Sequence, residues 1–305
     1  MTDTGIDATN ELAAAEAEFG LTNAIFYARP AGRKNLKLVF SLSLAVVLLA
    51  IALLVPVLPL ADPIEPDYDL VAASPGSGHL LGTDLHGRDE FSRVLWAIRT
   101  SMIVGVAASG LALAGGIAAG TAAVYGGRIA DTIFMRTADI FLSFPVVLGA
   151  IAIMAVMGPG RRNVFIAIAF FGWPIFARVF RSSLLSVREK GFVKAARVLG
   201  AGEARIFFHH VLPNSLPPLV SYTAVAVGGA ILAEAGLSFI NLGVQRPDPS
   251  LGLMLSESIG QFEPAPWLVI VPGTAITLIV LAFILLGDSA TKTLSPGSVR
   301  SGRSG

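Results

Sequence analysis

The sequence predicts an all-α integral membrane protein with about six transmembrane helices, and three observations indicate this class. Of the 305 residues, 54% are hydrophobic and only 14% are charged, whereas soluble domains carry about 25% charged residues. The mean hydropathy is +0.72. Apolar runs recur along the chain, each close to the roughly 20 residues that a helix needs to cross a bilayer. They cover roughly 38–60, 102–125, 140–157, 164–180, 216–240 and 267–287.

The first apolar run, 38–60, predicts a retained membrane helix rather than a cleaved signal peptide. The preceding segment 1–37 is polar and includes Asp3, Asp7 and Glu11. A signal peptide instead has a short basic start and an apolar core of about 7–15 residues. We therefore expect 1–37 to be a cytoplasmic segment without a defined role, and 61–98 to be an extracytoplasmic loop.

Two later runs carry signals of helix packing and bending. The second run contains Gly105, Gly116 and Gly120, and small residues let membrane helices approach closely. We expect this helix to pack against others in a bundle. In the third run, Pro145 lacks a backbone N–H and is expected to bend or locally unwind the helix.

The distribution of basic residues predicts the orientation of the chain. Most of the 22 Lys and Arg residues fall in segments that share one side of the membrane with the N-terminus, above all in 181–215. Cytoplasmic loops carry the excess of Lys and Arg. Both termini are therefore expected in the cytoplasm, with a core over 99–288 and a cytoplasmic tail over 289–305.

The loop 181–215 has the pattern of two short helices. Gly200, Ala201 and Gly202 predict the break between them, because glycine favours helix ends. Glu203 then lies near the start of the second helix, where the helix dipole favours an acid, and Pro213 is expected to end it. The first helix has an apolar stripe of Phe192, Ala195, Ala196 and Leu199. The second has an apolar face of Ile206, Phe207, His210 and Val211.

Three blocks of residues match the pattern of one protein family. The first block contains Gly82, Thr83, Asp84, Gly87, Arg88 and Asp89. The second contains Ala195, Ala196, Gly200, Leu212 and Pro213. The third runs from Glu234 through Ser238 to Gln245 and is followed by Pro247, Pro249 and Ser250. Over roughly 75–290 the chain resembles the inner-membrane permease subunits of bacterial ABC importers, and more narrowly the "C" type of the dipeptide/oligopeptide (peptide/nickel) family.

The resemblance implies a MetI-like permease in the bacterial inner membrane, a transport subunit rather than an enzyme. It implies a second permease subunit, two ATPase subunits and an extracytoplasmic peptide-binding protein as partners, besides membrane lipid. The chain has no G-x-x-x-x-G-K-[ST] phosphate loop, so ATP and Mg are expected on the ATPase subunits, with no cofactor or metal in this chain. The net charge of +1 gives no reason to expect a nucleic-acid partner.

The resemblance also implies that the loop couples the permease to its ATPase. The implied coupling residues are Lys194, Ala195, Ala196, Gly200, Ala201, Glu203, Leu212 and Pro213. Lys194 stands where the family pattern begins with an acid. A second interpretation of the same loop is an amphipathic segment that rests on lipid headgroups.

Glu234 and Ser238 are candidates for the substrate pathway or a gate. An acid within a membrane helix is costly and usually faces protein or a water-filled cavity. The alternative is that Glu234 already lies in the interface or in an outside loop. The residues alone leave both interpretations open.

Two other transport functions compete with peptide import. One is a permease for nickel or another small solute in the same family. The other is a secondary transporter driven by an ion gradient, although such proteins often show internal repeats and none is evident here. The absence of cysteine excludes thiolate metal sites, disulfides and cysteine nucleophiles.

Overall fold

A computed structural model describes residues 36–294 except 77. The expected N-terminal segment therefore lies almost entirely outside the described residues, as does the end of the expected C-terminal tail, 295–305. The described residues from Lys37 onward form one unit. Its described residues are helical apart from turns and loops, and they contain no strand, only an isolated bridge between Thr83 and Asp89. The all-α class is confirmed.

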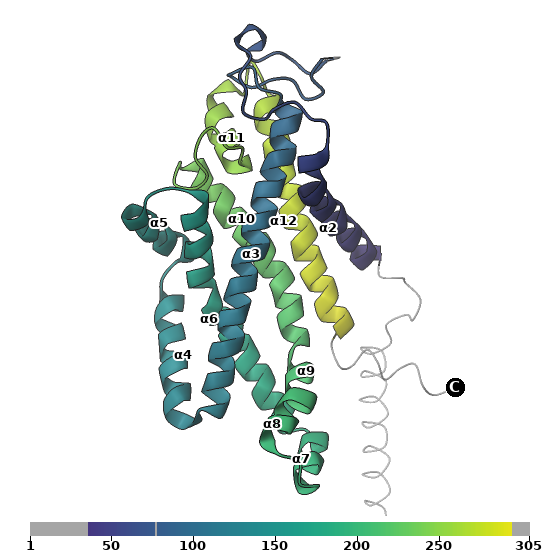
Figure 1. The fold of residues 1–305 in the computed structure, drawn as a ribbon, viewed down its shortest axis with the longest axis vertical. Coiled ribbons are helices and arrows are strands. Elements are labelled where there is room, and N and C mark those ends of the chain that lie inside the picture. The colour runs from purple at the N-terminus through teal and green to yellow at the C-terminus, as the bar shows by residue number, and fades with distance from the viewer. Residues whose placement is uncertain (1–35, 77, 295–305) are drawn as a thin grey trace, which may run out of the picture. The chain divides into compact units, whose positions relative to one another are not determined.

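The helices run mostly side by side (Figure 1). In chain order they are α2 (Leu36–Leu54), α3 (Glu90–Tyr125), α4 (Gly127–Ser143), α5 (Val146–Met157), α6 (Arg161–Arg188), α7 (Gly191–Val198), α8 (Glu203–Ile206), α9 (Leu212–Ser215), α10 (Pro217–Phe239), α11 (Leu251–Ser258) and α12 (Trp267–Leu294). A π-helical turn, Phe207–Val211, joins α8 to α9, and 3-10 turns occur at Val55–Val57, Tyr68–Leu70 and Ile259–Gln261.

Helix α3 packs against α4, α6 and α10, and its glycines make this possible. A Cβ on Gly116 would lie 2.2 Å from the Cβ of Phe176 in α6. A Cβ on Gly105 would lie 2.4 Å from Cγ1 of Ile231 in α10. Neither distance is tolerable between carbon atoms, so a larger residue would push these helices apart. The expected close packing of the second span is confirmed.

Five helices among the described residues are long and apolar enough to cross a membrane, and a sixth span exists if the bent pair α4–α5 counts as one. Helix α3 begins at Glu90 rather than near Met102, because the Asp89 carboxylate caps it by accepting from the Ser92 amide at 2.7 Å. Helix α6 likewise runs on to Arg188 rather than ending near Phe180.

The third predicted span is broken. Helices α4 and α5 meet at an angle of 88° around Phe144 and Pro145. Phe144 is extended, as expected for the residue before a proline. The expected bend is confirmed, but α4 begins at Gly127, well before the apolar run 140–157 that indicated this span. With 12 residues, α5 is about 18 Å long and too short to cross a bilayer alone.

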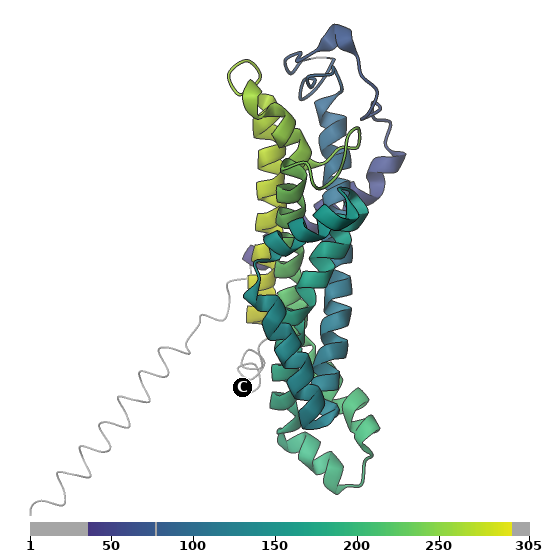
Figure 2. The same ribbon diagram turned by 90° about the vertical axis from the view of Figure 1, so that its left-hand side faces the viewer.

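The two ends of the bundle carry different structures (Figures 1 and 2). One end, called here the α7 end, consists of residues 189–216. The other, called the α11 end, consists of the loop 58–89 and residues 240–266. An apolar cluster fixes the α7 end to the bundle. Its buried members are Phe180, Leu184, Val187, Val193, Ile206, Val211 and Leu219.

Candidate functional site

The α7 end contains a sharp, well-defined turn at Gly200. Helix α7 closes with two hydrogen bonds, from the Ala201 amide to the Ala196 carbonyl and from the Gly200 amide to the Arg197 carbonyl, each 3.1 Å long. This is the Schellman pattern of a helix end. It places Gly200 at φ +83°, which favours glycine. The predicted break between two short helices is confirmed.

An ion pair holds the two arms of this turn together. Nε and Nη2 of Arg197 donate to the two carboxylate oxygens of Glu203 at 2.6 and 3.2 Å. This two-point geometry fixes orientation better than a single contact. Lys194 pairs separately with Glu189 at 3.1 Å. The α7–α8 hairpin is thus set by one glycine and one two-point ion pair.

The pairing with Arg197 makes the hairpin sensitive to acid. Its hydrogen bonds lower the pKa of Glu203 below the ordinary value of 4.5. The contribution of the pair is therefore complete above pH 4.5 and is lost as the pH falls through the lower, folded-state pKa. Both groups are exposed, so the effect is small.

We expect amide exchange at 199–203, corrected for its intrinsic pH dependence, to be constant from about pH 5 to 8 and faster in acid. Glu203→Gln should abolish the acid-dependent increase. An increase that persists in this variant would show that another group titrates.

The hairpin presents apolar side chains outward. Val198 and Leu199 are 87% and 86% exposed, and Phe208 is 61% exposed. The predicted stripe on α7 therefore faces mainly outward: Phe192, Ala195 and Leu199 are exposed, and only Ala196 is half-buried. Val193, outside that stripe, is the residue of α7 that packs inward. Exposed apolar groups held on a rigid turn are typical of a protein-binding surface.

The second arm packs largely as its sequence predicts. Ile206 and Val211 are buried, and Phe207 and His210 are half-buried. Pro213 does not end the arm, however. It lies in the first turn of α9, where its missing N–H leaves no helical bond unmade, and α10 follows almost directly. Of the other implied coupling residues, Ala201 and Leu212 are half-buried, and Lys194, Ala195, Gly200, Glu203 and Pro213 are exposed.

A buried carboxylate lies near the other end of α10. Glu234 has no exposed surface and accepts hydrogen bonds from three serine hydroxyls. Ser101 of α3 donates at 2.8 Å, Ser238 of α10 at 2.8 Å and Ser250, just before α11, at 2.9 Å. The sequence singled out Glu234 and Ser238 and placed Ser250 beside the same block, but it did not indicate that Ser250 or Ser101 contacts the carboxylate. The carboxylate joins three elements in the protein interior and lies in a helix, not in a loop.

Replacing Glu234 should separate its polar role from its shape. In Glu234→Leu the three hydroxyls lose their acceptor, at roughly 1–3 kcal/mol for each that finds no other partner. Glu234→Gln keeps one acceptor oxygen, so it should lose only about 1 kcal/mol. Thermal unfolding of the detergent-solubilised protein measures both. Equal melting temperatures for the two variants would contradict the role of the carboxylate as a shared acceptor.

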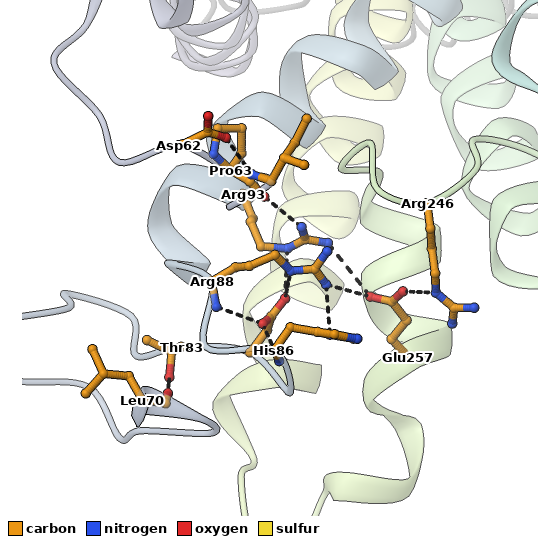
Figure 3. Close-up of polar contacts among 11 residues, drawn as sticks. Asp62, Pro63, Leu70, Thr83, His86, Arg88, Arg93, Arg246 and Glu257 are labelled. Atoms are coloured by element: carbon orange, nitrogen blue, oxygen red, sulfur yellow. Dashed lines mark hydrogen bonds and ion pairs between the residues drawn. The ribbon is translucent and has the colours of Figure 1, made fainter. Parts of the chain in front are cut away.

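The first sequence block builds a buried charge cluster at the α11 end (Figure 3). Asp84 accepts from Nε of Arg88 at 2.6 Å, and Nε of Arg93 lies 3.2 Å from the same oxygen without hydrogen-bond geometry. Glu257 of α11 lies 3.5 Å from Arg88 and 3.8 Å from Arg93, and it also pairs with Arg246. Arg88 is 5% exposed and Arg93 1%. Charges this deeply buried require partners.

The remaining residues of that block shape the backbone around the cluster. Gly82 and Gly87 have φ of +77° and +75°, and a Cβ on Gly87 would lie 1.6 Å from the Asp67 carbonyl oxygen. Thr83 is buried and accepts from the Ala73 amide at 2.8 Å. Asp89 caps α3 and contacts His79 at 2.8 Å. The sequence did not single out Glu257 or Arg246 as members of this site.

The spans and the broken α4–α5 pair define a multi-pass helical membrane protein with an exposed apolar hairpin at one end. The chain belongs to the family of binding-protein-dependent transport system inner membrane components, whose model matches residues 112–300. It is therefore a multi-pass permease of the bacterial inner membrane. Membership implies ATPase and substrate-binding partners in general.

Named relatives and solved structures agree with this assignment. The dipeptide transport system permease protein DppC of Alkalihalophilus pseudofirmus is 40% identical over 87% of each chain. The glutathione transport system permease protein GsiD of Pectobacterium atrosepticum is 40% identical over 75% of this chain and 76% of its own. A putative peptide permease protein of Brucella suis is 40% identical over 78% of this chain and 80% of its own.

Two solved transporters share the fold. An inward-facing MetNI methionine ABC transporter has a TM-score of 0.55 at 16% identity, covering 67% of this chain and 97% of its own. An amino acid ABC transporter with histidines has a TM-score of 0.53 at 13% identity, covering 67% of this chain and 92% of its own. The expected ABC permease family and MetI-like fold are confirmed.

Proposed function

We propose that this chain is a permease subunit of an ATP-driven importer for di- and oligopeptides. The names of the relatives at 40% identity support peptides as the substrate class. In this proposal the chain forms half of the pathway beside a second permease. Two ATPase subunits and an extracytoplasmic peptide-binding protein complete the importer, and ATP hydrolysis belongs to the ATPase subunits.

The observation that carries the mechanism is the outward apolar surface of the α7–α8 hairpin. Val198 and Leu199 are almost fully exposed there, on a turn that Gly200 and the Arg197–Glu203 pair hold in shape. A rigid hairpin can pass the closure of an ATPase dimer to α6 and α10 as a movement between two states. Lipid adsorption would not need a fixed turn.

This proposal sets the orientation of the chain. The α7 end faces the cytoplasm, together with 1–37 and 289–305, and the loop 61–98 lies on the other side. The high content of Lys and Arg in 181–215 supports this arrangement. The α11 end then faces the peptide-binding protein.

Uptake in the source cell tests the proposal. Deleting the gene should abolish import of a labelled oligopeptide, and the wild-type gene should restore it. Import should stop on ATP depletion and survive an uncoupler, which would exclude a gradient-driven transporter. Nickel uptake is measured in parallel: if nickel uptake falls and peptide import is unchanged, the chain is a nickel permease and the peptide proposal is wrong.

A further inference from the structure

A groove of about 610 Å³, lined by apolar and polar side chains, opens between α6, α10 and α12, toward the α7 end. The wall formed by α6 and its end repeats polar side chains every four residues, which places them on one helix face. These side chains are Arg178, Ser182, Ser186 and Lys190. Asn214 and Ser221 lie on the opposite wall. Polar groups from separate helices thus converge on one hollow.

The groove offers hydroxyl groups that the protein does not use. Ser182 and Ser186 are exposed, and neither hydroxyl has a hydrogen bond within the described part of the chain. Their neighbour Ser183 is different, because its hydroxyl donates to the Ser215 carbonyl at 3.0 Å. In a helix, a serine hydroxyl that contacts no other side chain commonly donates to a backbone carbonyl of the preceding turn. Ser182 and Ser186 instead remain available to water or a solute.

The opposite wall adds a backbone acceptor. Asn214, Pro217 and Pro218 line this wall, and because Pro218 in the first turn of α10 has no N–H, it cannot donate to the Asn214 carbonyl. Hydroxyl groups and a backbone acceptor therefore line the same groove. This combination matches the N–H and C=O groups of a peptide backbone.

The membrane context indicates that the groove is hydrated. Polar side chains on spanning helices face protein or a water-filled cavity. A second hollow, of about 650 Å³ between α4, α5 and α6, is lined only by apolar residues that include Phe141, Ile153 and Phe170. Helix α6 contributes to both hollows, so its two halves face different surroundings.

The mouth of the groove carries a positive charge. Arg178 pairs with Asp139 of α4, a carboxylate that it shares with Arg136. Lys190 is exposed and belongs to none of the ion pairs found within residues 36–294. A carboxylate entering the groove would therefore meet an uncompensated ammonium group.

We propose that this groove is a binding section of the transport path, in which the backbone of a passing peptide bonds the serine hydroxyls and the Asn214 carbonyl, and its terminal carboxylate pairs with Lys190. The proposal rests on the proposed function and adds the residues that contact the substrate. Contacts to the backbone are independent of the peptide's side chains, so the groove suits peptides of varied sequence.

Single cysteines test this directly, because the chain contains none. Ser182→Cys and Ser186→Cys are nearly isosteric, and Phe170→Cys is the control in the apolar hollow. Each variant is reconstituted in vesicles as the whole importer and treated with a polar, membrane-impermeant thiol reagent from the α7 side. We expect both serine positions to react at least about tenfold faster than the control, since only ionised, accessible thiols react.

During ATP turnover, excess alanyl-alanine should slow the reaction at Ser186→Cys, and complete modification should lower uptake of labelled alanyl-alanine at least about fivefold. Reaction as slow as at Phe170→Cys would overturn the proposal, as would full modification with unchanged uptake. Wild-type uptake tests the proposed function separately. Suppose that the wild-type importer takes up the dipeptide, but that Ser186→Cys reacts fast whether or not the dipeptide is present. This result would overturn peptide binding in the groove, and the proposed peptide import would stand.

Discussion

Asp84→Ala is expected to be the most destabilising single change at the α11 end. The Asp84 carboxylate accepts from the His86 and Arg88 amides at 2.8 and 3.0 Å as well as from the Arg88 side chain. Its removal takes away the carboxylate nearest to both buried guanidinium groups. Arg88 and Arg93 then keep the more distant Glu257, and Arg93 keeps the Pro63 carbonyl. Breaking a buried ion pair by removing one partner costs about 3–5 kcal/mol.

A matched control lies in the same loop. Asp62 also accepts a backbone amide, from Ile64 at 2.8 Å, but it is exposed and contacts no arginine. Asp62→Ala should therefore change stability by no more than about 1 kcal/mol. Thermal unfolding in detergent and the amount of folded protein in the membrane compare the two variants. If Asp84→Ala and Asp62→Ala have the same melting temperature, the buried cluster does not hold the α11 end together.

Gly200→Val is expected to abolish import while the protein still reaches the membrane. A Cβ at this position meets no atom within 4 Å, so the effect is purely conformational. A left-handed conformation costs a non-glycine residue about 1–2 kcal/mol, and a β-branched side chain adds strain. The turn should reopen, which would redirect Val198 and Leu199 away from the ATPase and lower uptake at least about tenfold.

Gly200→Asn supplies the control for this effect. Asparagine enters the left-handed region more readily than other side chains, and its side chain reaches one bond farther than valine's into the same open space. We expect Asn to retain most of the import rate. An equal loss of uptake in Gly200→Asn and Gly200→Val would show that bulk at the docking surface matters. Full uptake in Gly200→Val would contradict a fixed turn.

The sequence predicted most of the helices because apolar length and small-residue patterns are local signals. Pro145 and Gly200 marked a bend and a turn for the same reason, since each acts on its own backbone. The start of α3 was misplaced because Glu90 and Arg93 looked like loop residues. The burial of Glu90 and Arg93 depends on neighbours that are distant in the sequence. Glu257, for example, is 169 residues from Arg88, the arginine beside Arg93 with which it pairs.

Long-range pairing also explains what was missed around Glu234. Nothing in the sequence near Ser101 indicates that its hydroxyl meets a carboxylate 133 residues later. The apolar face of α7 shows a related difficulty. Periodicity detected a stripe, but only the packing of Val193 against the bundle decides that Leu199 points outward.

Protection of a single cysteine by the ATPase subunits shows whether they dock on the α7–α8 hairpin. The test position is Leu199→Cys, because the Leu199 side chain is 86% exposed on the hairpin. The control is Leu80→Cys, because Leu80 is 71% exposed on the α11 end. A maleimide should label both in the permease pair without ATPase subunits. Adding the ATPase subunits should protect Leu199→Cys and leave Leu80→Cys unchanged. Equal labelling of Leu199→Cys with and without ATPase would contradict docking on this hairpin.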